Sequence, residues 1–201
     1  MRIAVLGGMG LQGKAAIRDL ATSAEVAQVI CADADLAGWE AFAQSLKSDK
    51  LTAVPLDAAS VPAIRGILAD GVDAAIDLLP LPLMMNAFEA ALAARVPLVS
   101  TNYGHPVRPL HGRAREAGVV LMPECGLDPG IDLVLCGHAA GRLDEVHVFN
   151  SYCGGFPEPS ACDNPLNYKI SWNWDMVLRS QKRASVFIRD GRRIDVPADM
   201  Q

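Results

Sequence analysis

Three glycines near the start of the chain have the spacing of a phosphate-binding turn. Gly8, Gly10 and Gly13 form the pattern G-x-G-x-x-G, directly after the apolar run 2–6 and at the start of a helical pattern. In such a turn the first glycine permits a tight bend, the second lets the backbone approach a pyrophosphate, and the third lets helix and strand pack closely. The free N–H groups and positive end of the helix then face the phosphates. We therefore expect a dinucleotide to contact Gly8, Met9, Gly10, Leu11, Gln12 and Gly13.

Asp33 has the position of the acid that usually accompanies such a turn. It lies twenty residues after Gly13, at the carboxyl end of the second apolar run. A carboxylate there accepts hydrogen bonds from the ribose hydroxyls of the adenosine and repels a 2′-phosphate. Because no arginine follows Asp33 directly, we expect NAD as the cofactor, with NADP possible. The alternative is that Asp33 caps a helix.

Strand and helix patterns alternate along the first 130 residues. Apolar runs typical of strands cover residues 2–6, 26–31, 51–56, 72–79, 96–100 and 119–122, and helical patterns cover residues 11–21, 36–46, 64–69, 84–94 and 107–117. We expect the fourth helix to begin after Pro82. The alternation predicts an α/β fold, a Rossmann-type doubly wound parallel sheet with ligands at the carboxyl ends of the strands. Further cofactor contacts are therefore expected from the residues that follow the later strands: Asp57, Ala58, Leu79, Pro80 and Asn102.

The pattern changes after residue 130. Residues 131–140 are helical in pattern, residues 145–152 alternate as a long strand would, and Asp190-Gly191 separates two short strand-like runs, a strong hairpin signal. We expect residues 1–130 to form the NAD(P)-binding domain. Residues 131–201 would then begin an α+β substrate and dimerisation domain with a mixed or antiparallel sheet. Three strands and one helix leave that sheet without a covering layer, so this domain is expected to be incomplete.

Composition excludes several classes of protein. The 201 residues carry a net charge of −5, and no basic cluster points to nucleic-acid binding. No apolar run reaches the about 20 residues of a membrane span, and no signal peptide is apparent. The five cysteines show no C-x-x-C pair, so we expect a reduced, cytoplasmic chain without a metal site. Cys31 and Cys136 are expected in the core.

The whole chain resembles the saccharopine dehydrogenase family, in the branch of saccharopine reductases and lysine 6-dehydrogenases. Residues 5–14 and 32–36 are similar to the lysine 6-dehydrogenases. Three more specific motifs resemble the reductases: E-C-G-L-D-P-G-I-D at 124–132, Y-C-G-G-F-P at 152–157 and D-N-P-L-N-Y-K-I-S-W at 163–172. Asn167 departs from the pattern, since the reductases tend to have glycine there. The resemblance implies an NAD(P)-dependent dehydrogenase or reductase of lysine metabolism. It would act on the CH–NH or CH–NH2 group of an amino acid or its conjugate.

Hydride transfer requires the nicotinamide and the substrate carbon to be held about 3–3.5 Å apart in a site that excludes water. We expect Asp128 to orient the substrate amine, although Asp-Pro-Gly is also a helix-capping sequence. For Cys125 a small buried residue is favoured over a nucleophile, and for His105 a loop histidine without a role is favoured over an acid or base. Lys169 is the candidate partner of a substrate carboxylate; the alternative is a solvated lysine. The expected substrate-binding residues are Tyr103, Glu124, Cys125, Gly126, Tyr168 and Lys169.

Three function classes therefore remain. The first is a saccharopine dehydrogenase-like or lysine 6-dehydrogenase-like enzyme that forms a homodimer through its second domain. The second is a non-catalytic NAD-binding protein on the same fold. The third is an enzyme resembling carboxynorspermidine synthases, which would act on polyamine precursors.

Overall fold

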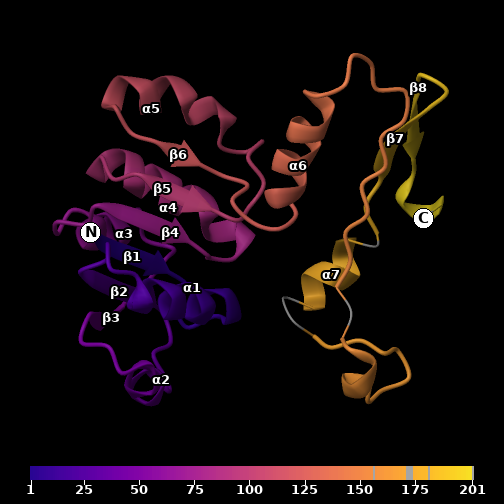
Figure 1. Ribbon diagram of the computed structural model, residues 1–201. Helices are drawn as coiled ribbons and strands as arrows, with labels where there is room; N and C mark the ends of the chain where they lie inside the picture. Colours follow the sequence, from indigo (N-terminus) through magenta and orange to yellow (C-terminus); the bar gives the residue numbers. More distant parts are fainter. Residues whose placement is uncertain (156, 171–173, 181, 201) are drawn as a thin grey trace. The chain divides into compact units, whose positions relative to one another are not determined.

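The computed structural model describes residues 1–155, 157–170, 174–180 and 182–200 (Figure 1). The chain divides into two compact units, Met1–Cys153 and Gly154–Gln201. The domain boundary expected after residue 130 stays a prediction.

A parallel sheet of six strands forms the centre of the first unit, in the order β3-β2-β1-β4-β5-β6 (Figure 1). The strands are β1 (Arg2–Leu6), β2 (Gln28–Asp33), β3 (Leu51–Pro55), β4 (Ala74–Asp77), β5 (Leu98–Ser100) and β6 (Leu121–Met122). From β1 the chain builds outward first through β2 and β3, then on the other side through β4, β5 and β6. This reversal is the switch point at which doubly wound sheets bind ligands, and it confirms the expected fold class.

Helices connect the strands. They are α1 (Leu11–Thr22), α2 (Trp39–Leu46), α3 (Val61–Leu68), α4 (Leu81–Ala94), the short 3-10 helix η1 (Arg108–Leu110), α5 (His111–Ala117) and α6 (Ile131–Ala140). The expected start of the fourth helix after Pro82 was wrong, because α4 begins at Leu81 with Pro82 in its first turn. A proline is tolerated there, since its missing N–H would have no partner inside the helix. The second helix was expected to begin at residue 36. It begins at Trp39 instead, because Gly38, with φ of 79°, has a left-handed conformation that an α-helix does not accommodate.

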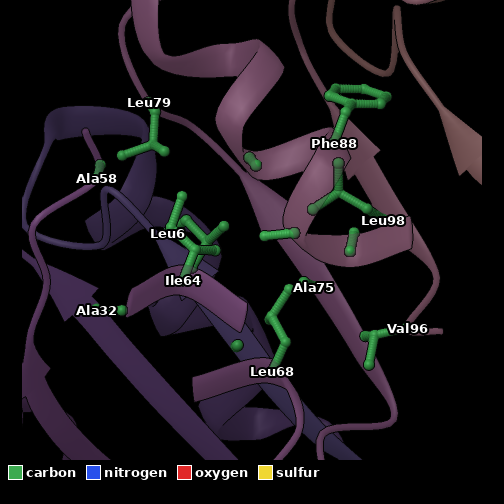
Figure 2. Packing of buried hydrophobic residues seen from close by; sticks show 14 of the residues in the cluster. Leu6, Ala32, Ala58, Ile64, Leu68, Ala75, Leu79, Phe88, Val96 and Leu98 are labelled. Carbon is green, nitrogen blue, oxygen red and sulfur yellow. The ribbon is translucent and has the colours of Figure 1, made fainter. Parts of the chain in front are cut away.

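Two apolar clusters hold the sheet, one on each face. The larger cluster includes Leu6 and Ala75 from the strands, Ile64 from α3 and Phe88 from α4 (Figure 2). The other is built around Val5, Ile17 and Trp39, and it includes the fully buried Cys31. Cys31 therefore lies in the core as expected, whereas Cys136 is half-buried. Side chains alternate between the two faces along each strand, which fixes the register of the carboxyl ends.

The second unit contains short elements. They are η2 (Pro159–Ala161), α7 (Trp174–Ser180), β7 (Ser185–Arg189), β8 (Arg192–Val196) and η3 (Ala198–Met200). The expected hairpin is confirmed: β7 and β8 pair antiparallel around Asp190 and Gly191, whose φ angles are 51° and 71°. Positive φ at both positions is the geometry of a two-residue type I′ turn, which Asp-Gly favours.

The strand expected at residues 145–152 was wrong, since those residues adopt no regular structure. Alternating side chains make a strand only where another strand pairs with its backbone, and in the described ranges no strand pairs with this segment. The described part of residues 131–201 therefore has two strands, β7 and β8, instead of the expected three. None of the helices in the described part of the chain is long and apolar enough to cross a membrane.

Candidate functional site

The glycine turn lies where β1 passes into α1. The Gly7 N–H donates to the Ala32 carbonyl at 2.8 Å, which ties the turn to the neighbouring strand β2. A Cβ on Gly8 would lie 2.6 Å from the Cys31 sulfur. A Cβ on Gly13 would overlap the backbone of Gly7 and Gly8. These close approaches explain why glycine is required at both positions.

The start of α1 is open to a ligand. Gly10 is the N-cap and offers no side-chain hydrogen bond, while Leu11 and Gln12 in the first turn are exposed. First-turn N–H groups have no acceptor inside a helix, so an anion placed there satisfies them. The closely packed turn and the uncapped helix together fit a dinucleotide pyrophosphate.

Asp33 ends β2 beside this turn. Its Oδ2 accepts a hydrogen bond from the Met9 N–H at 2.9 Å, and its Oδ1 accepts from the Asp35 N–H at 3.3 Å. The N-cap of α2 is Gly38, so Asp33 does not cap that helix. Each carboxylate oxygen retains a further acceptor position. Asp33 can therefore hold the glycine turn and accept a ribose hydroxyl at the same time.

Asp57 and Ala58 follow β3 at the same edge of the sheet, which we call the carboxyl edge. The Asp57 Oδ1 accepts from the Ala59 N–H at 3.0 Å and closes a local turn. Ala58 is buried, and its carbonyl accepts a hydrogen bond from the Asn86 side chain at 3.0 Å. Their expected contacts with the cofactor stay predictions.

The ends of β4 and β5 carry a polar group that the sequence analysis missed. Among the described residues, Asp77 and Ser100 are the two buried polar ones, and they are register partners on neighbouring strands. The Ser100 hydroxyl donates to Asp77 Oδ2 at 2.7 Å, and the Leu79 N–H donates to Asp77 Oδ1 at 3.1 Å. An aspartate inside an otherwise apolar run was the sequence signal that could have found this site.

Asn102 completes that group. Its backbone N–H donates to the Ser100 hydroxyl oxygen at 3.2 Å, and its side-chain Nδ2 lies 3.4 Å from the Leu79 carbonyl oxygen. Leu79 is buried, whereas Pro80 beside it is exposed. The structure thus brings the expected cofactor residues Leu79, Pro80 and Asn102 together at one point on the carboxyl edge.

The turn after β6 is held by the neighbouring loop. The Glu124 N–H donates to the Asn102 carbonyl at 2.9 Å, and Glu124 Oε1 accepts from the Gly104 N–H at 2.9 Å. The Gly126 N–H donates to the Pro129 carbonyl at 3.0 Å. Glu124 therefore fixes the shape of the site, and any contact of Glu124 or Gly126 with substrate stays a prediction.

Asp128 does not cap α6. The N-cap is Gly130, and the carboxylate that lies at the helix start is Asp132, whose Oδ1 accepts from the Gly130 N–H at 2.7 Å. Asp128 is exposed. Loss of solvent around the Cys153 thiol, followed by the charge of Asp128, raises the pKa of Cys153. Asp128 is thus free of the capping role, and its role toward a substrate amine stays a prediction.

Cys125 is exposed, so the expected buried position was wrong. It follows a short edge strand, and a two-residue strand leaves the next turn uncovered. Neighbouring protein still removes part of its water and raises the pKa of the Cys125 thiol, which disfavours the reactive thiolate. Tyr103 is half-exposed, with its ring 6.5 Å from that of His105.

Tyr168 and Lys169 lie in the second unit. The Lys169 ammonium pairs with Asp163 at 2.7 Å, and the Tyr168 ring lies 5.3 Å from that of Trp174. Asn167 has φ of 49°, a left-handed conformation that glycine favours and asparagine tolerates, which accounts for the departure at this position. Phe156, Ser171 and Trp172 of the two later motifs lie outside the described residues. The described ranges contain no cluster of His, Cys, Asp or Glu able to hold a metal ion.

Comparison with protein-family models decides the relationship. Residues 3–122 match the model described as saccharopine dehydrogenase NADP binding domain, and residues 126–201 match the saccharopine dehydrogenase C-terminal domain. The chain belongs to the saccharopine dehydrogenase family. Residues 3–122, which lie within the first unit, accordingly correspond to the NADP-binding domain of that family.

Named relatives agree with the family. The chain is 34% identical over 196 residues to saccharopine dehydrogenase [NADP(+), L-glutamate-forming] of Saccharomyces cerevisiae, covering 94% of this chain and 42% of the relative. It is 33% identical over 128 residues to the mitochondrial alpha-aminoadipic semialdehyde synthase of Bos taurus, covering 61% of this chain and 14% of that protein. The chain thus spans less than half the length of these relatives.

A solved structure gives the same result for the fold. The apo saccharopine dehydrogenase (L-Glu forming) of Saccharomyces cerevisiae superimposes with a TM-score of 0.84 at 31% identity. The match covers 99% of this chain and 44% of that chain. The family, the fold class and the relationship to NAD(P)-dependent oxidoreductases expected from the motifs are therefore confirmed, and the names of the relatives specify NADP.

Proposed function

We propose that this chain provides the cofactor-binding part, and part of the substrate-binding region, of an NAD(P)-dependent oxidoreductase. The enzyme acts on the CH–NH group of a saccharopine-like conjugate or the CH–NH2 group of lysine. The observation that carries the proposal is the glycine turn with Asp33 at the switch point, in a chain aligned over 94% of its length with a saccharopine dehydrogenase. The bound cofactor would accept or supply the hydride, and the protein would position it.

The residues at the carboxyl edge have separable roles in this proposal. The open first turn of α1 binds the pyrophosphate, and Asp33 binds the adenosine ribose. The loops after β4 and β5 border the nicotinamide. Asp128 orients the amine of the substrate. Lys169 of the second unit, which is paired with Asp163, stays the candidate partner of a substrate carboxylate. No group of the described residues is assigned the proton transfer.

We propose NAD as the preferred cofactor, although the matched family model and the yeast relative are both named for NADP. A 2′-phosphate would lie beside Asp33 and Asp35, and the sequence contains no lysine or arginine between residues 33 and 46. A cationic candidate outside this segment is Lys14, whose ammonium lies 5.8 Å from the centre of the Phe42 ring. The two carboxylates repel the 2′-phosphate of NADP and the single lysine attracts it, so the balance of charge favours NAD.

The test is a cofactor and substrate screen. Saccharopine and lysine are each mixed with the full-length protein that contains this chain and with NAD or NADP, and the absorbance of the reduced nicotinamide is followed. Reduction with either amino acid supports the proposal. Dinucleotide binding without turnover of any amino acid supports the non-catalytic alternative. Turnover restricted to a diamine with an aldehyde supports the carboxynorspermidine synthase-like alternative.

The finer expectations of a homodimer formed through the second domain and of a cytoplasmic location stay predictions. Strand β7 of the second unit presents Val186 and Ile188 at 54% and 75% exposure, which is compatible with burial against another chain. Sedimentation velocity distinguishes a dimer from a monomer.

A further inference from the structure

A closed set of hydrogen bonds joins the ends of β4 and β5. Asp77 accepts from the Leu79 N–H and from the Ser100 hydroxyl, and the Ser100 oxygen accepts from the Asn102 N–H. The Asn102 side chain returns to the Leu79 carbonyl oxygen at 3.4 Å. We call these four residues the β4–β5 network. It fixes the two loops relative to each other.

The network lies on one side of the switch point. β4 pairs with β1 opposite β2, so the loops after β4 and β5 lie across the glycine turn from Asp33. With the pyrophosphate at the glycine turn and the adenosine ribose at Asp33, the other half of a dinucleotide must extend toward β4 and β5. Within the network Asn102 is half-exposed and Asp77 and Ser100 are fully buried, and the exposed Pro80 follows Leu79 directly.

We propose that Asp77 is a positioning residue for the nicotinamide half of the cofactor, acting through Ser100, Leu79 and Asn102. The proposal rests on the function proposed above. The Asp77 side chain touches no ligand itself. It holds the Leu79 backbone and the Asn102 side chain in the arrangement that borders the nicotinamide.

The surroundings of Asp77 favour this role over a contribution to stability. A buried carboxyl costs free energy unless a cation or enough donors compensate for lost water. Among the described residues Asp77 forms no ion pair. Its register partners are Leu6 of β1 and Ser100 of β5, Glu89 of α4 is paired with Arg113, and Arg65 of α3 is exposed. An apolar residue would pack in this place at lower cost.

The same surroundings make the network sensitive to pH. Burial raises the pKa of Asp77 to about 6, although the hydrogen bonds from Ser100, Leu79 and Asn102 partly oppose that rise. Above that pH the carboxylate accepts the hydrogen bonds from the Ser100 hydroxyl and the Leu79 N–H. Once protonated, the carboxyl has fewer acceptor positions and one hydrogen to donate, so the Ser100 hydroxyl must reorient and Asn102 is held less firmly.

The experiment uses two ligands that differ in the nicotinamide. NADH contains both halves of the cofactor, whereas ADP-ribose lacks the nicotinamide and keeps the adenosine, pyrophosphate and ribose. Their affinities are measured by isothermal titration for the unmodified chain, Asp77→Asn and Ser100→Ala. Asp19→Asn, on the exposed face of α1, is the matched control. Unchanged ADP-ribose binding also reports that each variant is folded.

We expect Asp77→Asn and Ser100→Ala to weaken NADH binding roughly tenfold and to change ADP-ribose binding less than about twofold. In the unmodified chain the ratio of NADH to ADP-ribose affinity should fall as the pH is lowered through about 6, and in Asp77→Asn it should stay flat. Titrations of the adenine and phosphates cancel in this ratio. Without ligand, the Asn102 side-chain amide resonances should shift over the same pH range in the unmodified chain and not in Asp77→Asn.

The outcomes separate the two proposals. Failure of the unmodified chain to bind either ligand overturns the proposed function and the inference with it. Equal loss of NADH and ADP-ribose binding in the two variants, or no loss of NADH binding, overturns the inference alone. An affinity ratio independent of pH, or Asn102 resonances that do not shift near pH 6, also contradicts it.

Discussion

The Asp33 carboxylate accepts a hydrogen bond from the backbone N–H of Met9, across an N···O distance of 2.9 Å. One side chain at the end of β2 thereby holds the glycine turn that follows β1. The acid expected to bind the ribose and the turn expected to bind the pyrophosphate are thus one connected structure.

Replacing Asp33 should change the cofactor preference. Asp33→Asn keeps an oxygen that can accept from Met9 but removes the charge that would repel a 2′-phosphate. We expect the ratio of NAD to NADP affinity to fall roughly tenfold, equivalent to about 1.4 kcal/mol. Isothermal titration of the variant with both cofactors measures this ratio.

Asp19→Asn, which removes one carboxylate from the exposed face of α1, is the control for that experiment. Its effect on the ratio should be smaller than that of Asp33→Asn. A chain that already binds NADP more tightly than NAD would contradict the role given to Asp33.

The glycines of the chain should differ sharply in their tolerance of alanine. Gly13→Ala would place a Cβ against the Gly7 and Gly8 backbone, so the turn must shift, and we expect a loss of about 1–3 kcal/mol of stability together with most of the dinucleotide affinity. A Cβ on Gly66 in α3 would meet no atom within 4 Å. Gly66→Ala should therefore raise the free energy of unfolding by about 0.5–1 kcal/mol. Urea denaturation compares the two variants, and equal effects would count against a close approach of helix and turn at Gly13.

The buried carboxyl of Asp77 should make stability depend on pH. Burial raises its pKa from 3.8 to about 6, so between these values the folded chain holds a proton that the unfolded chain has released. The contribution of the protonated Asp77 carboxyl to the free energy of unfolding is complete below pH 3.8 and is lost as the pH rises through about 6. The shift of roughly two units corresponds to about 3 kcal/mol.

Asp77→Asn does not titrate and should lack that decline. Its free energy of unfolding relative to the unmodified chain should therefore rise with pH up to about 6 and then level off. Denaturation in urea across this range measures the difference, with Asp19→Asn as the control that keeps the slope. Parallel stability curves for Asp77→Asn and the unmodified chain would show that Asp77 has an ordinary pKa.

Features set by short-range sequence could be predicted. The glycine turn, Asp33 and the Asp190-Gly191 hairpin each depend on residues close together in the chain, and all three have the expected local structure. The order of alternating strands and helices then determined the sheet, because right-handed βαβ connections leave few arrangements.

Features that depend on distant residues could not. The segment 145–152 has the alternation of a strand but no pairing strand within the described ranges. Asp77 was seen as an interruption of an apolar run, and its role became apparent when the register placed Ser100 beside it. The sequence Asp-Pro-Gly is typical of a helix cap, and this offered Asp128 as a capping residue of α6. In the structure the carboxylate that accepts from the Gly130 N–H at the start of α6 belongs to Asp132, which lies inside the helix.

Asp128 should affect the substrate and not the cofactor. If it orients the substrate amine, Asp128→Asn should lower kcat/KM for the amino-acid substrate by roughly one to two orders of magnitude and leave NADH affinity unchanged. Asp144→Asn, at an exposed position after α6, is the matched control. Steady-state kinetics with saccharopine or lysine provide the measurement, and an unchanged kcat/KM would remove Asp128 from the site.

The central claim is that the glycine turn binds a pyridine dinucleotide, and titration of the chain with NADH by calorimetry tests it most directly. We expect saturable binding of one NADH per chain, abolished by Gly13→Val and retained in Gly66→Ala. Absence of binding to the unmodified chain, or equal binding to the Gly13→Val variant, would contradict the account.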